Sequence, residues 1–155
     1  MEKAIGHFKT TLDIASPFDW HYEKSESHSS LAQIYSDQSR FGDVHKHIKQ
    51  AKFHSINDAY ALGRATDLQA RSWYREGRYE EAKVECLCAI EVFGNLGVVK
   101  EVERCRNLLR RIEKSMEPSV VITPGGSDLN GEFPKTILLL TPFDSGSPRL
   151  ESDAQ

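Results

Sequence analysis

Apolar residues recur every three or four positions through the first 115 residues of this chain, in six successive stripes. Such spacing places the apolar side chains along one face of an α-helix. Only Pro17 precedes Met116, and no segment there alternates with the period of two that is typical of a strand. The sequence therefore predicts an all-α domain over residues 1–115, built from six amphipathic helices of about 14–20 residues joined by short turns.

The remaining residues, 116–155, differ in composition. They contain five of the six prolines and four of the ten glycines, which is incompatible with a long helix. They also carry two basic and six acidic side chains, so the negative charge of the chain lies here. We expect a mostly disordered tail. Its apolar run Ile137–Leu140 is unusual for a spacer, and one hypothesis is that the tail folds back as a cap on a partner-binding surface.

Bulk properties narrow the class of protein. A net charge of −3 is too close to neutral to indicate a nucleic-acid or membrane-surface protein. Three cysteines, an odd number, argue against a disulfide framework and for a reducing compartment. No apolar run exceeds five residues, far below the roughly 20 of a membrane span. We expect an intracellular protein without a membrane segment, in the cytoplasm or, as a second option, the nucleus.

Residues 29–51 and 67–89 share a pattern at an offset of 38 positions. In both copies an alanine precedes an aromatic residue, a turn follows, and another aromatic residue opens a helix with small residues on one face. The first copy has Ala32, Tyr35, Phe41, Val44 and Ala51, and the second has Ala70, Trp73, Tyr79, Ala82 and Ala89. Ala4 and Phe8 fit the second helix of an earlier copy. Leu62-Gly63 and Leu96-Gly97, 34 residues apart, would open successive first helices.

The period and these positions resemble the tetratricopeptide repeat (TPR), a helix–turn–helix unit of about 34 residues. The resemblance covers residues 1–115 and implies antiparallel helices stacked into a right-handed superhelix. It also implies that the alanines allow close helix packing, while the aromatic residues fill the space between neighbouring hairpins. Two and a half repeats should leave apolar surface open at both ends, so a second copy of the chain is one candidate partner.

The sequence bears on two roles that TPR proteins have. The segment from Leu62 to Gly97 is similar to the fungal TPR arrays that accompany NB-ARC or NACHT-type ATPases, although no phosphate-binding loop occurs here. Co-chaperone TPR domains hold a carboxylate with lysine, asparagine and arginine at set groove positions. The corresponding residues here are Ser29, Gln33, Leu68 and Val102, which argues against that role.

No residue pattern predicts catalysis, a cofactor or a metal site. His45 and His47, two positions apart on a helix, point in nearly opposite directions, and the same holds for Cys86 and Cys88. His47 and His54 share a face but lie two turns apart. We expect solvated or half-buried histidines and cysteines that pack as small residues.

The feature that favours a binding function is a basic helix face. Arg64, Arg71 and Arg75 lie nearly in line on one helix, with Asp67 at the edge, whereas Leu62, Thr66, Ala70 and Trp73 lie opposite. In TPR proteins this outer face lines the concave groove. The residues assigned to partner binding are Gln33, Asp37, Arg64, Asp67, Arg71, Tyr74 and Arg75. The matching face of the last helix would be Val98, Glu101, Cys105, Leu108 and Leu109.

These observations leave several interpretations open. The arginine face is either a solvated charged surface or a site for carboxylates of a partner. The leading hypothesis is a non-catalytic scaffold whose groove binds a protein or peptide, an acidic one being one option. The alternatives are a fragment of the sensor arm of a nucleotide-switch protein, and a helical repeat that binds RNA. Near-neutral charge and the lack of paired stacking aromatics argue against RNA.

Overall fold

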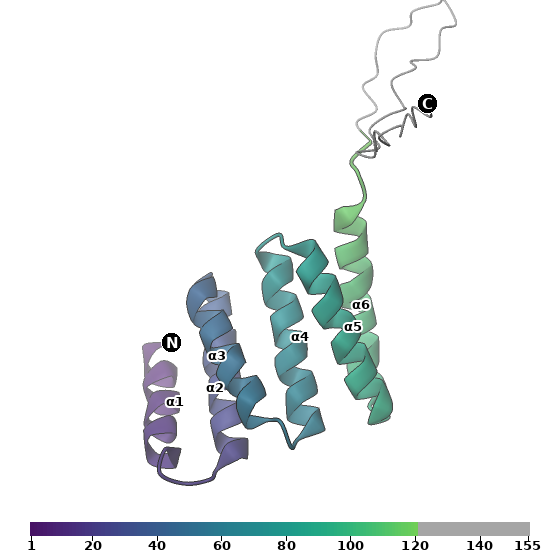
Figure 1. The fold of residues 1–155 in the computed structure, drawn as a ribbon. Helices are drawn as coiled ribbons and strands as arrows, with labels where there is room; N and C mark the ends of the chain where they lie inside the picture. The colour runs from purple at the N-terminus through teal and green to yellow at the C-terminus, as the bar shows by residue number, and fades with distance from the viewer. Residues whose placement is uncertain (121–155) are drawn as a thin grey trace, which may run out of the picture. The chain divides into compact units, whose positions relative to one another are not determined.

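The computed structural model describes residues 1–120, and residues 1–119 form one compact unit of six helices. These are α1 (Glu2–Ala15), α2 (His21–Asp37), α3 (Phe41–His54), α4 (Ala59–Arg75), α5 (Tyr79–Asn95) and α6 (Val99–Met116). Consecutive helices run in opposite directions (Figure 1). No strand occurs among residues 1–120. The prediction of an all-helical domain with six helices is confirmed, whereas the predictions for the tail beyond residue 120 lie outside the described residues.

Three of the interhelical turns have the same backbone geometry. Each contains one residue with a positive φ two positions before the next helix: Ser39 at 57°, Gly77 at 76° and Gly97 at 69°. In the α4–α5 turn, Arg78 N–H donates to Trp73 C=O at 2.9 Å and Gly77 N–H donates to Tyr74 C=O at 3.1 Å. This pair of hydrogen bonds is a Schellman motif, which requires a left-handed residue at the glycine position. The same pair closes the other two turns.

The proposed equivalence of Leu62-Gly63 with Leu96-Gly97 is wrong. Gly63 lies inside α4, whereas Gly97 lies in the turn before α6. The two glycines have different physical roles. Gly97 provides the positive φ, while a Cβ at Gly63 would lie 2.9 Å from a ring carbon of Phe93, so glycine allows α4 and α5 to approach closely. The first helices actually begin at His21, Ala59 and Val99, which gives a repeat of 38 and then 40 residues.

The small residues predicted to pack the repeats are buried. We call the contact between α2 and α3 the first seam, and the contact between α4 and α5 the second seam. Ala32, Tyr35, Val44 and Ala51 belong to a cluster around the first seam or are fully buried beside it. In the second seam Ala70, Ala82 and Ala89 are fully buried. Ala4, which the sequence places with Phe8 on the packed face of this helix, is instead exposed. Ile5, Phe8 and Leu12 pack α1 against the cluster around the first seam, and Ala15 is fully buried.

Trp73 and Tyr79 are half-buried rather than core residues. The Trp73 ring stacks on His45 of α3 with the centroids 3.9 Å apart, and the Arg78 guanidinium lies 3.9 Å from the same centroid. Gln69, one turn earlier on α4, contacts His45 Nδ1 at 2.8 Å. Trp73 therefore joins the two hairpins, as the sequence pattern predicted, but at the rim of the core.

Candidate functional site

The first helices of the hairpins, α2 and α4, and the final helix α6 lie side by side and enclose a groove. Two adjacent hollows form it, about 320 Å³ between α2 and α4 and about 310 Å³ between α4 and α6. Both are lined by Asp67, Arg71 and Arg104. The first also contains Gln33 and Arg64, whereas Tyr74, Arg75, Asn107, Leu108 and Arg111 line only the second. Of the seven residues assigned to partner binding, the groove brings together all but Asp37 in its lining.

The three arginines of the predicted basic face reach across to α2, each at an offset of 38 or 39 residues. Arg64 donates to both oxygens of Glu26, at 2.7 and 2.9 Å. Arg71 donates to Gln33 Oε1 at 3.2 Å. Arg75 donates to Ser36 Oγ at 3.0 Å and to Asp37 Oδ1 at 3.3 Å. Arg64 and Arg75 thus already contact carboxylates of the chain itself. Asp37 lies at the edge of the groove, where it pairs with Arg75.

Asp67 lies beneath the basic face rather than on it, with 1% of its surface exposed. Its Oδ2 accepts a hydrogen bond from Arg104 Nη2 at 3.2 Å and lies 3.2 Å from Arg71 Nε, an ion-pair contact without hydrogen-bond geometry. The Cys105 thiol contacts Oδ1 at 3.4 Å. A buried carboxylate is tolerated when cations and donors surround it. Asp67 is thus out of reach of a partner and instead holds two arginines in place.

The face of α6 that enters the groove was predicted in the wrong register. A 34-residue offset predicts Val98, Glu101, Cys105, Leu108 and Leu109. Of these, Leu108 does lie in the groove lining, whereas Cys105 is fully buried. The true offset from α4 to α6 is 40 residues, so Arg104, Asn107 and Arg111 occupy the positions of Arg64, Asp67 and Arg71. The repeated arginines at this offset were the signal that could have identified them.

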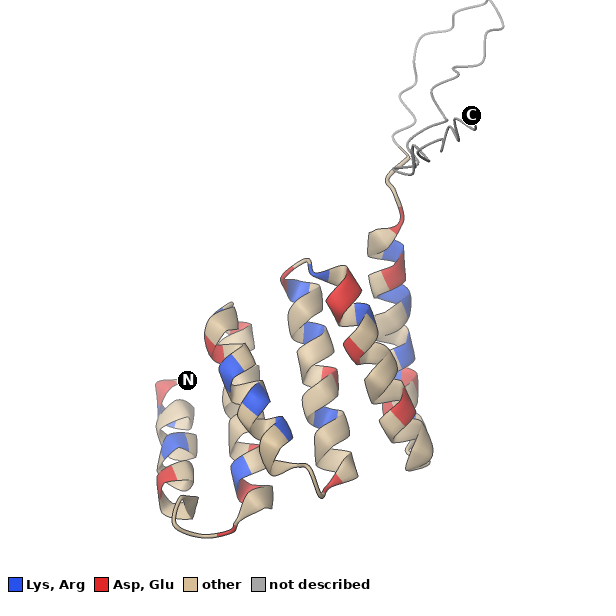
Figure 2. Ribbon diagram, viewed as in Figure 1, with Lys and Arg blue, Asp and Glu red and all other residues tan. Residues whose placement is uncertain are grey.

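Tyr74 lies beside an arginine of α6 in the second hollow. The Arg111 guanidinium lies 5.3 Å from the centre of the Tyr74 ring. The neighbouring Ser115 side chain and, to a smaller extent, the Arg111 charge lower the pKa of the Tyr74 hydroxyl. Charges of both signs occur along α4 and α6, with basic residues more frequent on α6 (Figure 2).

Cys86 and Cys105 behave as packing residues. Both are fully buried, and the Cys86 thiol donates to Cys105 C=O at 3.1 Å. Burial, followed by the charge of Asp67, raises the pKa of each thiol to about 12. Both thiols are therefore protonated at neutral pH, which makes them poor nucleophiles.

Four histidines form a row on the first seam, and of these the sequence pattern relates only His47 and His54 to each other. His28 and His47 approach with their Nδ1 atoms 2.9 Å apart, and His21 and His54 do so at 3.2 Å. The rings of His28 and His54 stack with their centroids 5.9 Å apart, which joins the two pairs. Spacing within one helix could not reveal these contacts, because each pair joins α2 to α3. Among the described residues no three His, Cys, Asp or Glu side chains converge as metal ligands would.

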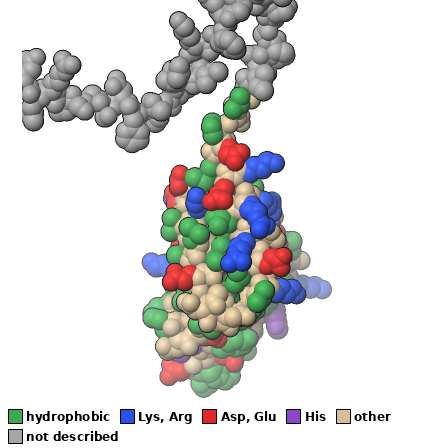
Figure 3. All heavy atoms as spheres, turned by 90° about the vertical axis from the view of Figure 1, so that its right-hand side faces the viewer, with side chains coloured by type: hydrophobic (Ala, Val, Ile, Leu, Met, Phe, Trp, Pro, Cys, Tyr) green, Lys and Arg blue, Asp and Glu red, His purple; other side chains and the backbone are tan. Residues whose placement is uncertain are grey.

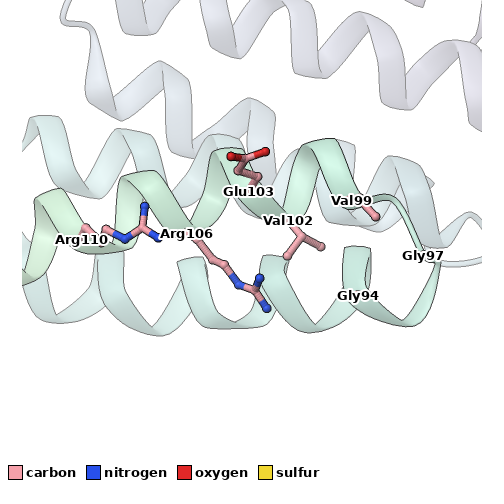
Figure 4. Close-up of a pocket in the computed structure, with 7 residues that line it drawn as sticks. All are labelled: Gly94, Gly97, Val99, Val102, Glu103, Arg106 and Arg110. Carbon is pink, nitrogen blue, oxygen red and sulfur yellow. The ribbon is translucent and has the colours of Figure 1, made fainter.

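The outer side of α6 combines apolar and charged side chains. Residues Gly94, Val99, Val102, Glu103, Arg106 and Arg110 line a shallow hollow there (Figure 4). At the 40-residue offset, Glu103, Arg106 and Arg110 correspond to Gly63, Thr66 and Ala70, which in α4 pack against α5. Figure 3 shows basic and acidic side chains on this end face, with hydrophobic side chains among them. Charged side chains on a terminal face favour the solubility of a repeat array.

No protein-family model matches the chain, and no curated protein or solved structure matches it. Within residues 1–120, none of the helices has the length and apolar character needed to cross a membrane. The groove is therefore the feature of the described residues from which a function can be inferred.

Proposed function

We propose that the helical unit is a TPR-type interaction scaffold that holds an acidic segment of a protein partner in the groove between α2, α4 and α6. Repeated architecture supports this proposal. The same Schellman turn follows α2, α4 and α5, and the Arg–aromatic contact of the second copy, Arg78 with Trp73, recurs as Arg40 over the Tyr35 ring at 4.5 Å. The repeat of 38 to 40 residues is about one helical turn longer than the 34-residue TPR unit.

The arginine row is the observation that carries the proposal. Five arginines from two neighbouring helices line the hollows, whereas the only carboxylate in that lining is buried beneath them. A guanidinium has five N–H donors, and the contacts to α2 use one or two of them. The remaining donors are available to carboxylates of a ligand, which arginine binds in a bidentate manner.

The internal ion pairs also prepare the groove for a ligand. Glu26 and Gln33 fix the directions of Arg64 and Arg71 before anything binds, so less side-chain entropy is lost on association. An acidic ligand would compete with Glu26 and Asp37 for these donors. Binding should therefore be moderate in affinity and strongly dependent on salt.

The test measures the binding of fluorescent Glu-rich peptide pools to the full chain by fluorescence anisotropy, at low and at physiological salt. A Lys-rich pool serves as the counter-probe. Arg64→Gln/Arg75→Gln should weaken Glu-rich binding by about tenfold or more, because each charged hydrogen bond contributes about 1.5–3 kcal/mol. Arg106→Gln/Arg110→Gln removes the same charge from the outer side of α6 and should change affinity little. Equal losses of affinity in the two double variants would show that binding depends on the overall charge rather than on the groove, and would overturn the proposal.

A further inference from the structure

The hollow between α4 and α6 contains more positive charge than a carboxylate would need. Its lining includes four arginines, Arg71, Arg75, Arg104 and Arg111, together with the Asn107 amide and the Tyr74 ring. The one acidic residue in the lining is the buried Asp67. The adjoining hollow toward α2 has three arginines, Arg64, Arg71 and Arg104, and its other residues besides Asp67 are serine, glutamine and apolar side chains.

The charges in this hollow are unevenly satisfied. Asp67 is shared by Arg71 and Arg104, and Arg75 turns toward Ser36 and Asp37 of α2. Arg111 forms no ion pair with any residue in the described part of the chain, and its neighbour is the Tyr74 ring. With Arg75 paired to Asp37, and with one carboxylate shared by Arg71 and Arg104, two net positive charges remain around an open volume of about 310 Å³.

The arrangement is also held in place before a ligand arrives. The buried Asp67 contacts Arg71 on its own helix and Arg104 on α6, so it draws guanidinium groups from two helices toward one point. Asn107 lies one turn after Arg104, and Arg111 one further turn along α6. The side chains that remain exposed present N–H donors from two sides of the hollow, which suits a tetrahedral anion with several acceptor oxygens better than a planar carboxylate.

We propose that this hollow binds a phosphate monoester on a side chain of the partner segment, that is, a phosphorylated serine, threonine or tyrosine. The inference rests on the proposed function, because it assigns the segment in the groove a phosphorylated residue. A phosphate monoester carries about −1.5 to −2 charges at neutral pH and has three strong acceptor oxygens. It matches the surplus of guanidinium groups between α4 and α6, whereas Glu or Asp side chains match the hollow between α2 and α4.

The experiment compares three peptide pools that share an acidic flanking sequence and differ at one position, which is phosphoserine, glutamate or serine. Anisotropy with the full chain should show the phosphoserine pool bound about tenfold more tightly than the glutamate pool, the difference expected for one additional charge-assisted contact. Inorganic phosphate, titrated as a competitor, should displace the pool only at far higher concentration, because the flanking residues contribute to binding.

Two neighbouring residues provide a matched pair of variants. Arg111→Gln removes a guanidinium from this hollow, while Arg110→Gln removes one that lines the separate hollow on the outer side of α6. Because Arg111 has no ion pair in the described chain, its loss should leave the fold intact, which circular dichroism would verify. We expect Arg111→Gln to abolish the preference for phosphoserine over glutamate and Arg110→Gln to preserve it.

The outcomes separate this inference from the proposed function. Equal binding of the phosphoserine and glutamate pools, with the effect of Arg64→Gln/Arg75→Gln retained, would overturn the phosphate site and leave the acidic groove in place. Displacement by inorganic phosphate at the concentration of the phosphopeptide would assign the hollow to free phosphate and overturn the peptide assignment. Absence of binding to any pool would overturn both.

Discussion

The two seams have the same geometry but different chemistry. At the offset of 38 residues, Phe93 in the second seam corresponds to Ser55 in the first, and Gly63 corresponds to Ser25. In the second seam the Phe93 ring fills the space that Gly63 leaves open. In the first, the hydroxyls of Ser25 and Ser55 both donate to Ala51 C=O, at 3.2 and 2.6 Å. One seam is closed by an aromatic ring against a glycine, and the other by hydrogen bonds between small residues.

The difference extends along the surface of the two hairpins. His28 and His47 of the first seam correspond to Thr66 and Glu85 of the second, so the histidine row belongs to the first hairpin alone. Thr66 donates its hydroxyl to Leu62 C=O within α4, and Glu85 pairs with Lys52 of α3. The same helical geometry thus permits a row of histidines in one hairpin and, in the other, a threonine and an ion-paired glutamate. The comparison teaches that the backbone turns set the hairpin, while the seam residues set its stability and its response to pH.

The largest effect is expected from Phe93→Ala. Phe93 is the largest fully buried side chain, and removal of its ring leaves a cavity against Gly63. Truncation of a buried Phe costs about 3–5 kcal/mol. The matched change in the first seam, Ser55→Ala, removes one local hydrogen bond and should cost about 1 kcal/mol. Urea unfolding of both variants measures the difference, and similar losses would contradict the distinction between the seams.

Gly63→Ala tests the same contact, because it should destabilise the protein when Phe93 is present and stabilise it when Phe93 is replaced by alanine. A Cβ at position 63 would lie 2.9 Å from Phe93 Cε1 and 3.1 Å from Val92 Cγ1. Overpacking costs about 1–3 kcal/mol, which outweighs the gain of about 1 kcal/mol in helix propensity. In the Phe93→Ala background the added methyl group has room, so the same substitution should stabilise the protein. A double-mutant cycle of unfolding free energies decides this, and additive effects would show that the two residues do not touch.

The sequence predicted the helices because their apolar period and the proline boundary are local properties. It also identified the turn residues, since Ser39 and Gly77 occur at the same place before an aromatic helix start. Prediction failed where a position depends on another helix. The burial of Asp67 depends on Arg104 and Cys105 of α6, and the face of α6 depends on a repeat spacing that lengthens from 38 to 40 residues. The histidine row was missed for the same reason.

Acid should destabilise the first hairpin more than the second. Burial, then the charges of His47 and His54, lowers the pKa of His28 from 6.5 to about 4. Burial and nearby lysines, Lys46 and Lys9 for His47 and Lys24 for His54, also lower those two pKa values, while Asp43 opposes the shift at His47. A histidine whose folded pKa is depressed binds fewer protons when folded than when unfolded. Its contribution is therefore complete above pH 6.5 and is lost as the pH falls toward 4.

Hydrogen exchange between pH 7.5 and 4.5, corrected for intrinsic rates, measures this response helix by helix. Protection in α2 and α3 should fall below about pH 6.5, the unperturbed histidine pKa, whereas α4 to α6 should keep more of their protection. His28→Gln should flatten the pH dependence in the first hairpin, because the most strongly shifted group is removed. A loss of protection spread evenly over all six helices would exclude the histidine row as the cause.

The smallest effect concerns the Arg–aromatic pairs, which the two hairpins share. The Arg78 guanidinium lies 3.9 Å from the Trp73 centroid, and Arg40 lies 4.5 Å from that of Tyr35. Both arginines are about half-exposed and also pair with an acidic residue one turn ahead, Glu81 and Asp43. A cation over an exposed ring contributes about 0.5–1 kcal/mol, with tryptophan the stronger partner. Arg78→Gln should therefore destabilise the protein slightly more than Arg40→Gln.

A second substitution separates the ring contact from the ion pair. Arg78→Lys keeps a positive charge near Glu81 but loses the planar group that stacks on Trp73. If stacking dominates, the lysine variant should lose nearly as much stability as Arg78→Gln; if the ion pair dominates, it should resemble the wild-type protein. We expect the first result, because an exposed ion pair contributes little and Trp73 already stacks on His45 at the junction of the hairpins. Trp73 would then be the residue through which the turn of the second hairpin stabilises its contact with the first.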